Sequence, residues 1–307
     1  RTQASHELVK ACGGKLSRVF WSSSGAEAIE AAIKFASVAT GKSHFVSARG
    51  GYHGKTLGAL ALTYKKDYRQ PFKSLLLKNT FVSYGNISSL EKAITDKTAA
   101  IVLEPVQGET GVIIPPAGYL AAVADLCREK RILLIIDEIQ TGMGRTGKFL
   151  AIHQEGIKPD IVCIGKSMGG GIPVGATLVS EKIAQKLTKG IHTSTFGGNP
   201  LAAAGVLATL KLLTPKQLKN NAQLGAYFLK SLTSVKSSKI KAVRSKGLML
   251  AVELTEKNTP TLKSLQDKGI LAIPAGDYVV RFLPPYTITK TQIDRTMAAL
   301  KEVLILK

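Results

Sequence analysis

The feature that most constrains the fold is an alternation of short apolar runs with helix-like segments over the first two-thirds of the chain. Apolar runs of strand length lie at 99–103, 132–136 and 160–164. Apolar residues at helical spacing indicate helices at 25–37, before the first of these runs, and at 116–130, between the first and the second. Because strands that alternate with helices pair in parallel, this order predicts an α/β fold with helices on both faces of a mostly parallel sheet.

Three ionisable residues each follow one of these apolar runs. Glu104 and Asp137 come directly after two of them, and Lys166 follows the third two residues later. In open α/β sheets the reactive groups gather outside the carboxyl ends of the strands. We therefore expect these three side chains to converge in space although they are far apart in the sequence.

The pattern changes after a helix-like stretch at 200–213. The remaining chain alternates helices and strands in a separate α+β order, with expected elements at 215–232, 249–254, 261–268, 278–283 and 290–305. We therefore predict a large α/β domain over residues 1–213 and a smaller C-terminal α+β domain over residues 214–307.

The chain is strongly basic, with 42 Lys and Arg against 21 Asp and Glu and a net charge of +21. From Lys182 to Val252 it contains basic residues but no Asp or Glu. Such a stretch attracts an acidic partner, whether nucleic acid, an anionic surface or an acidic protein. A solvated Lys-rich surface would give the same pattern. Aromatic residues are sparse here and no nucleic-acid-binding motif is present, which disfavours nucleic acid.

Other features limit the class of protein. No apolar run approaches the roughly 20 residues that a membrane span needs. Cys12, Cys127 and Cys163 are widely scattered, which suits a reducing compartment such as the cytoplasm and gives no metal-ligand spacing. The chain starts at Arg1 without an initiator Met or a signal peptide, so we expect its native beginning to be missing.

Four features together match what pyridoxal phosphate (PLP) requires. Lys166 precedes three glycines and supplies an amine, and Asp137 supplies an acid for the pyridine nitrogen. Ser24-Gly25-Ala26 opens a helix and can present N–H groups to a phosphate, and Tyr52 offers an aromatic plane. A lysine at a strand end beside glycines suits a buried amine with a lowered pKa. Taken singly, each feature has an ordinary structural explanation, namely a surface turn, a cap, a helix start or a core aromatic.

Five long motifs in this order resemble the class III aminotransferases of fold type I. The resemblance runs from about His6 to the C-terminus. It implies a PLP-dependent transferase fold with a seven-stranded-type sheet and a smaller C-terminal domain, and a family N-terminal segment that this chain lacks. The motifs are 23–28 (SSGAEA), 52–58 (YHGKTLG), 103–109 (LEPVQGE), 136–147 (IDEIQTGMGRTG) and 193–202 (TSTFGGNPLA).

The resemblance implies roles around the cofactor ring. Lys166 would be the Schiff-base lysine and, once released, the base that moves the proton. Asp137 would pair with the pyridine nitrogen, and Gln140 would contact the 3-hydroxyl of the ring. Tyr52 would stack on the ring.

The resemblance also implies a phosphate site that two subunits share. Gly25 and Ala26, with Ser24 before them, would bind the phosphate of the same chain's cofactor. Thr195, in the Ser-Thr-Phe-Gly-Gly motif, would reach the phosphate in the neighbouring subunit. The expected active unit is therefore a homodimer.

On the substrate side, the resemblance implies that Glu109 and Arg281 form a pair that opens to admit glutamate or 2-oxoglutarate. Glu104 is also expected on the substrate side. Lys55 stands where the family usually has Arg. Lysine keeps the positive charge but loses the bidentate fork that holds a carboxylate, so substrate choice is expected to differ.

Within this family the chain most resembles the acetylornithine and LysW-type carrier-protein aminotransferases of arginine and lysine biosynthesis, in the segments 65–72, 98–112 and 280–285. The predicted reaction moves an amino group between glutamate/2-oxoglutarate and the terminal semialdehyde of an amino-acid biosynthetic intermediate. The predicted substrate is [LysW]-aminoadipate semialdehyde, or the semialdehyde that corresponds to [LysW]-ornithine or N-acetylornithine. A small acidic carrier protein would explain the basic stretch. The alternatives are a free-substrate ω-aminotransferase acting on ornithine, putrescine or 4-aminobutyrate, and a basic binding protein that has lost catalysis.

Overall fold

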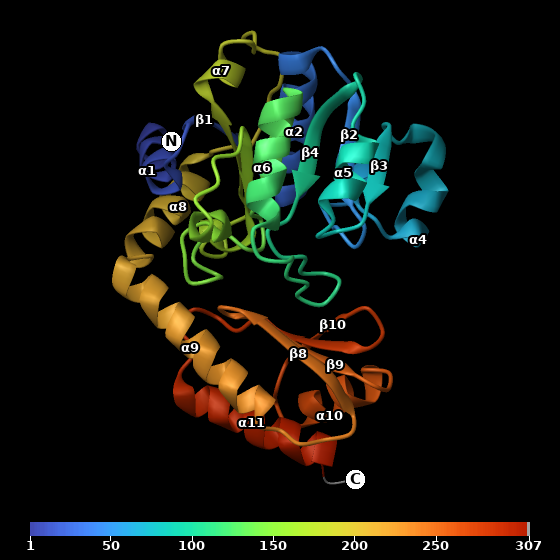
Figure 1. Cartoon of the computed structure of the whole chain (residues 1–307). Coiled ribbons are helices and arrows are strands. Elements are labelled where there is room, and N and C mark those ends of the chain that lie inside the picture. The colour runs from blue at the N-terminus through green and yellow to red at the C-terminus, as the bar shows by residue number, and fades with distance from the viewer. Residues whose placement is uncertain (306–307) are drawn as a thin grey trace. The chain divides into compact units, whose positions relative to one another are not determined.

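The computed structural model describes residues 1–305, which form two compact units, each with its own sheet and core (Figure 1). The first unit contains residues 1–105, 115–143 and 149–214. The second contains 106–114, 144–148 and the chain from 215 onward. The sequence placed the boundary at 213/214 and left the two short internal segments in the first domain.

The first unit is built on a seven-stranded sheet in the order β1-β7-β6-β5-β4-β2-β3. All neighbouring strands pair in parallel except β7, which runs antiparallel to both β6 and β1. The α/β fold with a mostly parallel sheet is thereby confirmed. The strands are β1 (Leu16–Ser22), β2 (His44–Ala48), β3 (Asn79–Val82), β4 (Thr98–Leu103), β5 (Leu133–Asp137), β6 (Ile161–Ile164) and β7 (Gly175–Ser180).

Helices cover both faces of this sheet. Figure 1 shows α5 and α6 side by side on the near face, while α2 packs against the opposite face. The helices of the first unit are α1 (Thr2–Cys12), α2 (Gly25–Thr40), α3 (Leu57–Leu62), α4 (Lys66–Arg69), α5 (Ile87–Ala93), α6 (Tyr119–Lys130), α7 (Glu181–Ala184) and α8 (Pro200–Leu212). Short 3-10 helices are η1 (Gln70–Leu75), η2 (Ala151–Gln154) and η3 (Lys166–Gly169).

Helix α2 starts where the sequence predicted, because its first turn is capped from both directions. The Ser24 hydroxyl accepts a hydrogen bond from the Glu27 amide at 3.2 Å, and the Glu27 carboxylate accepts one from the Ser23 amide at 2.6 Å. This reciprocal arrangement satisfies N–H groups that a helix start leaves without partners. The capped end of α2 follows directly from the carboxyl end of β1.

The second unit is an antiparallel sheet in the order β10-β11-β9-β8 with three helices. Its elements are α9 (Pro215–Thr233), β8 (Ile240–Lys246), β9 (Met249–Leu254), α10 (Thr259–Asp267), β10 (Ile273–Ala275), β11 (Val279–Phe282) and α11 (Lys290–Ile305). The predicted elements at 249–254 and 290–305 are confirmed without a shift. Among residues 1–305 there is no helix that is both long and apolar enough to cross a membrane.

Candidate active site

The carboxyl edge of the large sheet brings together the three ionisable residues that the sequence singled out. Glu104 follows β4, Asp137 ends β5, and Lys166 lies two residues beyond β6, and these three strands are neighbours. The pKa of Glu104 is raised to about 7, mainly by burial and also by the charge of Asp137, while the positive charges of His53 and Lys166 oppose the rise. The predicted convergence is therefore confirmed.

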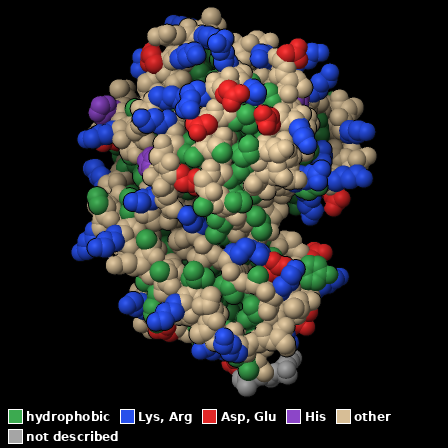
Figure 2. Space-filling view, in the orientation of Figure 1, with side chains coloured by type: hydrophobic (Ala, Val, Ile, Leu, Met, Phe, Trp, Pro, Cys, Tyr) green, Lys and Arg blue, Asp and Glu red, His purple; other side chains and the backbone are tan. Residues whose placement is uncertain are grey.

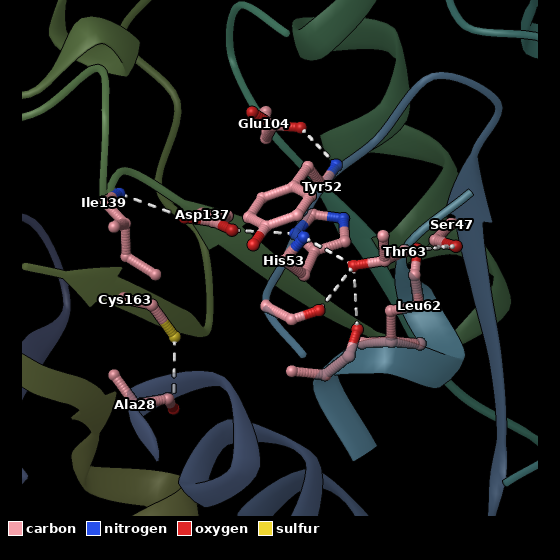
Figure 3. A network of polar contacts seen from close by, with 12 residues as sticks. Ala28, Ser47, Tyr52, His53, Leu62, Thr63, Glu104, Asp137, Ile139 and Cys163 are labelled. Carbon is pink, nitrogen blue, oxygen red and sulfur yellow. Dashed lines mark hydrogen bonds and ion pairs between the residues drawn. The ribbon is translucent and has the colours of Figure 1, made fainter. Parts of the chain in front are cut away.

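Asp137 is the best-positioned acid at this edge. Its side chain is buried, and Asp137 is only 4% exposed. One carboxylate oxygen, Oδ2, lies 2.7 Å from Nδ1 of His53, and the other, Oδ1, accepts a hydrogen bond from the Ile139 amide at 3.0 Å (Figure 3). A carboxylate oxygen has two lone pairs, so each oxygen has capacity for one further donor.

His53 holds Asp137 in place and was missed from the sequence. It is 3% exposed, and its amide donates to the Thr63 hydroxyl, which in turn donates to the Gly54 carbonyl (Figure 3). Burial lowers the pKa of His53, but its hydrogen bond to Asp137 and the charges of Asp137 and Glu104 raise that pKa above its ordinary value. The sequence motif drew attention to Tyr52 rather than to the histidine beside it.

Glu104 fixes the segment that carries Tyr52 and His53. Glu104 is 6% exposed, and its Oε1 accepts a hydrogen bond from the Tyr52 amide at 2.9 Å. The link ties the segment after β2 to the end of β4. As Figure 3 shows, Tyr52, His53, Glu104 and Asp137 therefore come from three segments around one edge of the sheet.

The start of α2 lies against the same edge. A Cβ added at Gly25 would lie 2.9 Å from the Ile139 side chain, two residues beyond Asp137. A Cβ added at Gly175, which begins β7, would overlap the Ser24 carbonyl oxygen. These contacts leave no room for side chains, so the N-terminal turn of α2 approaches the edge closely. A helix N-terminus in this place can bind an anion through its free N–H groups.

Lys166 differs from the sequence expectation in its environment. The expectation of a buried amine is wrong for the chain as described, because Lys166 is exposed. The reason is its place: β6 ends at Ile164, and Lys166 opens η3 beyond the edge of the sheet. Its φ of 49° lies in the left-handed region, which costs a residue with a Cβ about 1 kcal/mol. A side chain kept at such a position points to a functional requirement.

The other predicted residues of the first unit lie around this centre with less burial. Gln140 is half-buried in the turn after Asp137. Lys55 is exposed, and its Nζ lies 4.1 Å from the centroid of the Tyr68 ring. Thr195 is exposed and lines a cavity of about 480 Å³ together with Ser23 and other residues. The cavity places the Thr195 loop near the start of α2.

Glu109 and Arg281 belong to the second unit. Arg281 lies in β11 and is 4% exposed, and its NH1 forms an ion pair with Oε1 of Glu109 at 2.9 Å. Glu109 lies in a loop whose ends are joined by the Gln107–Ile113 bridge. Arg244 donates to the Gly111 carbonyl at 2.8 Å and anchors the same loop.

Glu138, next to Asp137, makes the free energy of unfolding depend on pH. It is fully buried, and burial raises its pKa to about 7 from 4.5. Because the folded state then binds a proton more tightly than the unfolded state, stability is lost as pH rises from about 4.5 to about 7 and is constant above. For Glu138 this loss is about 3 kcal/mol.

We predict that Glu138→Gln removes this loss, so that the free energy of unfolding falls less between pH 5 and pH 8 than in the parent. Glutamine keeps the shape and can still accept from the Ile152 amide. Urea unfolding at the two pH values measures the difference. The exposed variant Glu91→Gln is the control and should keep the parent's slope. An equal slope in Glu138→Gln and the parent would contradict the assignment.

Comparison with known proteins identifies the family. Residues 1–304 match the sequence profile of the family described as aminotransferase class-III. The acetylornithine aminotransferase of Methanopyrus kandleri is 41% identical over 307 residues, which cover 99% of this chain and 79% of that protein. The [LysW]-aminoadipate semialdehyde transaminase of Deinococcus radiodurans is 44% identical over 308 residues, covering 99% and 72%.

Solved structures give the same result. An ornithine aminotransferase from Toxoplasma gondii, with PLP in partial occupancy at its active site, has a TM-score of 0.92 and 32% identity and covers 98% of this chain and 75% of its own. The N-acetylornithine aminotransferase of Stenotrophomonas maltophilia has a TM-score of 0.83 and 30% identity, covering 98% and 78%. Fold and comparisons define an aminotransferase of fold type I. The chain belongs to the class-III aminotransferases, a PLP-dependent family.

Proposed function

We propose that this chain binds PLP at the carboxyl edge of the large sheet and uses Lys166 to attach it covalently. The observation that carries the proposal is the buried Asp137 carboxylate, fixed by His53 and the Ile139 amide with capacity for another donor. A protonated pyridine nitrogen is a donor of this kind. The capped start of α2 supplies an anion site at the same edge. The Asp137 carboxylate therefore suits the pyridine nitrogen of the cofactor, and the start of α2 suits its phosphate.

The other cofactor contacts are proposed from the roles that the family resemblance implies, and the positions of the side chains support them. Ser24, Gly25 and Ala26 would take the phosphate on the N-terminal turn of α2. Tyr52 would lie against the ring, and Gln140 would contact the 3-hydroxyl. When bound, PLP supplies an electron sink that lets a proton leave the carbon bearing the amino group of the substrate. The first unit would be the PLP-binding domain and the second unit the small domain.

Lys166 and Asp137 would divide the remaining chemistry. The Asp137 carboxylate lies 2.7 Å from Nδ1 of His53 and would hold a proton on the pyridine nitrogen by opposite charge. Lys166 is exposed at the start of η3, two residues beyond the end of β6, and its amine would take a proton from the substrate carbon and return it. Its positive charge next to Glu104 favours the ionised form of that carboxylate.

For the substrate, we propose the terminal semialdehyde of an amino acid whose α-amino group is blocked, with glutamate as donor and 2-oxoglutarate as keto product. The names of the relatives at 41% and 44% identity support this class, in lysine or arginine biosynthesis. In the second unit, the ion pair between Arg281 and Glu109 would open so that the guanidinium binds the side-chain carboxylate of glutamate. Lys55 and Glu104 would contact the other substrate.

A small acidic carrier protein remains part of the proposal because of the LysW-dependent relative. The structure weakens the charge argument for it. Lys241 and Arg244 of the acid-free stretch both pair with Glu253, and Lys239 pairs with Glu256. Figure 2 shows Lys and Arg side chains distributed over the visible faces of both units rather than gathered in one patch. The stretch has no Asp or Glu in its own sequence, but in the folded chain acidic residues from outside it lie beside it.

We also propose that the active unit is a homodimer in which Thr195 reaches the cofactor phosphate of the other subunit. Thr195 is exposed, and beside it the apolar side chains of Phe196 and Leu201 are 71% and 65% exposed. Large apolar side chains that are this exposed suit a surface that a second copy of the chain covers. The cytoplasmic location expected from the cysteines stays a prediction.

Comparison of substrates tests the proposed function. The PLP-loaded enzyme is assayed with glutamate as donor and, as acceptor, carrier-linked aminoadipate semialdehyde or the semialdehyde that corresponds to N-acetylornithine or ornithine. Putrescine and 4-aminobutyrate are assayed as free donors with 2-oxoglutarate as acceptor. We expect kcat/KM for a blocked substrate to exceed that for free ornithine at least about tenfold, as one well-placed contact of about 1.4 kcal/mol provides. A preference for free ornithine would support the second candidate, a free-substrate ω-aminotransferase, which the Toxoplasma gondii structure favours. No turnover of any of these would refute both.

A further inference from the structure

A cavity of the first unit lies at the amino edge of the sheet, opposite the edge that carries the candidate active site. It has a volume of about 760 Å³, and its lining includes Arg128 and Arg131 at the end of α6 and Leu133 and Leu134 at the start of β5. The five residues of β5 separate the two edges by about 13 Å. A ligand in this cavity would therefore not be a substrate in the active site.

Two smaller cavities extend this one in both directions. One, of about 220 Å³, shares Lys15, Gly156, Ile157 and Lys158 with it. The other, of about 200 Å³, shares Arg131, Leu133, Asp160 and Lys182 with it. We call the three together the amino-edge groove. The volume of its central cavity is in the range of small-molecule sites.

The floor of the groove is fixed by Asp160. Its Oδ2 accepts a hydrogen bond from the Leu134 amide at 2.9 Å, and its Oδ1 forms an ion pair with Lys15 at 2.6 Å. Its own amide donates to the Leu134 carbonyl at 3.0 Å. These bonds tie the beginnings of β5 and β6 together, so the groove is a preformed feature of the sheet edge.

Most carboxylates along the groove are already neutralised. Asp160 pairs with Lys15, Asp125 pairs with Arg128, and Glu181 pairs with Arg18. By contrast, four cationic side chains that line the groove have no hydrogen-bond or ion-pair partner among residues 1–305. These are Lys42, Arg131, Lys158 and Lys182.

Arg131 is held in a backbone conformation that arginine does not prefer. It follows the last turn of α6 with a φ of 54°, where glycine is the usual residue. A positive charge near a helix C-terminus interacts favourably with the helix dipole, and this offsets part of the strain. The guanidinium nevertheless lines both the central cavity and the 200 Å³ cavity, where it faces no carboxylate partner.

We propose that the amino-edge groove binds a small polyanion, a metabolite with two or more phosphate or carboxylate charges, at a site separate from the active site. Four unpaired cations around a fixed floor supply the charge complementarity. Within the described chain no Phe, Tyr or Trp lines the groove. Stacking platforms for nucleobases are thus lacking, and this favours a small polyanion over single-stranded nucleic acid. The proposal is independent of the substrate of the active site.

The test uses the PLP-loaded enzyme, in which the cofactor already occupies its own phosphate site. Isothermal calorimetry at constant ionic strength follows binding of two probes, inorganic pyrophosphate and citrate. We expect one molecule of probe to bind per chain, more weakly as salt rises. Binding of pyrophosphate alone would define a phosphorylated ligand, binding of citrate alone a polycarboxylate, and binding of both a general polyanion site.

Arg131→Gly is the decisive variant, because glycine accepts the left-handed conformation and removes only the charged side chain. Its melting temperature should be equal to or above that of the parent, while its Kd for the probe rises about tenfold or more, as loss of a charge-assisted hydrogen bond gives. Lys92→Ala removes an exposed charge outside the groove and should bind the probe like the parent. Lys182→Ala should weaken binding as Arg131→Gly does. Unchanged binding in both groove variants, or no binding of either probe to the parent, would overturn the proposal.

Discussion

Lys166→Ala is expected to abolish transamination, with kcat lowered at least about 10⁴-fold. The amine would both attach the cofactor and carry the proton, and a general acid–base residue alone contributes about 10²–10⁴ in rate. The purified variant should also lose the visible absorption that a covalently attached PLP gives the parent. Steady-state kinetics and an absorption spectrum of the same sample measure the two effects.

The fold of this variant should be intact. Lys166 is exposed, and alanine at a φ of 49° carries the same backbone cost as lysine. The melting temperature of the cofactor-free protein should therefore match that of the parent. Lys97→Ala, an exposed lysine away from the site, is the matched control and should keep both rate and spectrum. A Lys166→Ala enzyme within tenfold of the parent's kcat would show that another residue carries the proton.

Asp137→Asn should produce the second largest effect, a decrease in kcat of roughly 10³-fold. The amide keeps the shape of the carboxylate and can still accept from His53, but it removes the negative charge that would hold the pyridine nitrogen protonated. Preorganised electrostatic contacts of this kind contribute about 10²–10³ each. Pre-steady-state measurement of the half-reaction with glutamate separates this step from binding.

His53→Gln is the comparison for this variant, because His53 acts only through Asp137. Loss of a charge-assisted hydrogen bond to a buried group costs about 1.5–3 kcal/mol, so its kcat should fall by about 10- to 100-fold, less than in Asp137→Asn. The pH profile of kcat should shift in His53→Gln, since the charge beside Asp137 has changed, whereas a purely structural effect would leave the profile in place. Equal losses in the two variants with an unchanged profile would contradict a positioning role.

Much of the fold follows from local sequence patterns. The strand at 249–254 is a short apolar run, the helix at 290–305 has apolar residues at helical spacing, and both are confirmed. β7 was not predicted, because its Gly-rich start and mixed polarity do not stand out from a loop. Its pairing with β1 depends on contacts between residues more than 150 positions apart, which no local pattern encodes.

The candidate site, too, could be predicted from the sequence only in part. Strand ends predicted the convergence of Glu104, Asp137 and Lys166, because the carboxyl ends of parallel strands share an edge. The pairing of His53 with Asp137 could not be predicted, since the residues lie 84 positions apart and only the fold brings their atoms within 2.7 Å. The exposure of Lys166 and the acids that neutralise part of the basic stretch likewise depend on tertiary structure.

The position of β1 has a consequence for synthesis of the chain. Among residues 1–305, β1 pairs with β7 alone, with Ser22 opposite Gly175, and the start of α2 follows directly after β1. A ribosome adds about 5–20 residues per second, so β1 leaves it on the order of 10 s before its pairing strand has been made. During this interval its backbone N–H and C=O groups and the Trp21 side chain are exposed to other chains. A nascent chain that stops before β7 is complete leaves β1 without its pairing strand, and β1 is where we expect chaperones to bind.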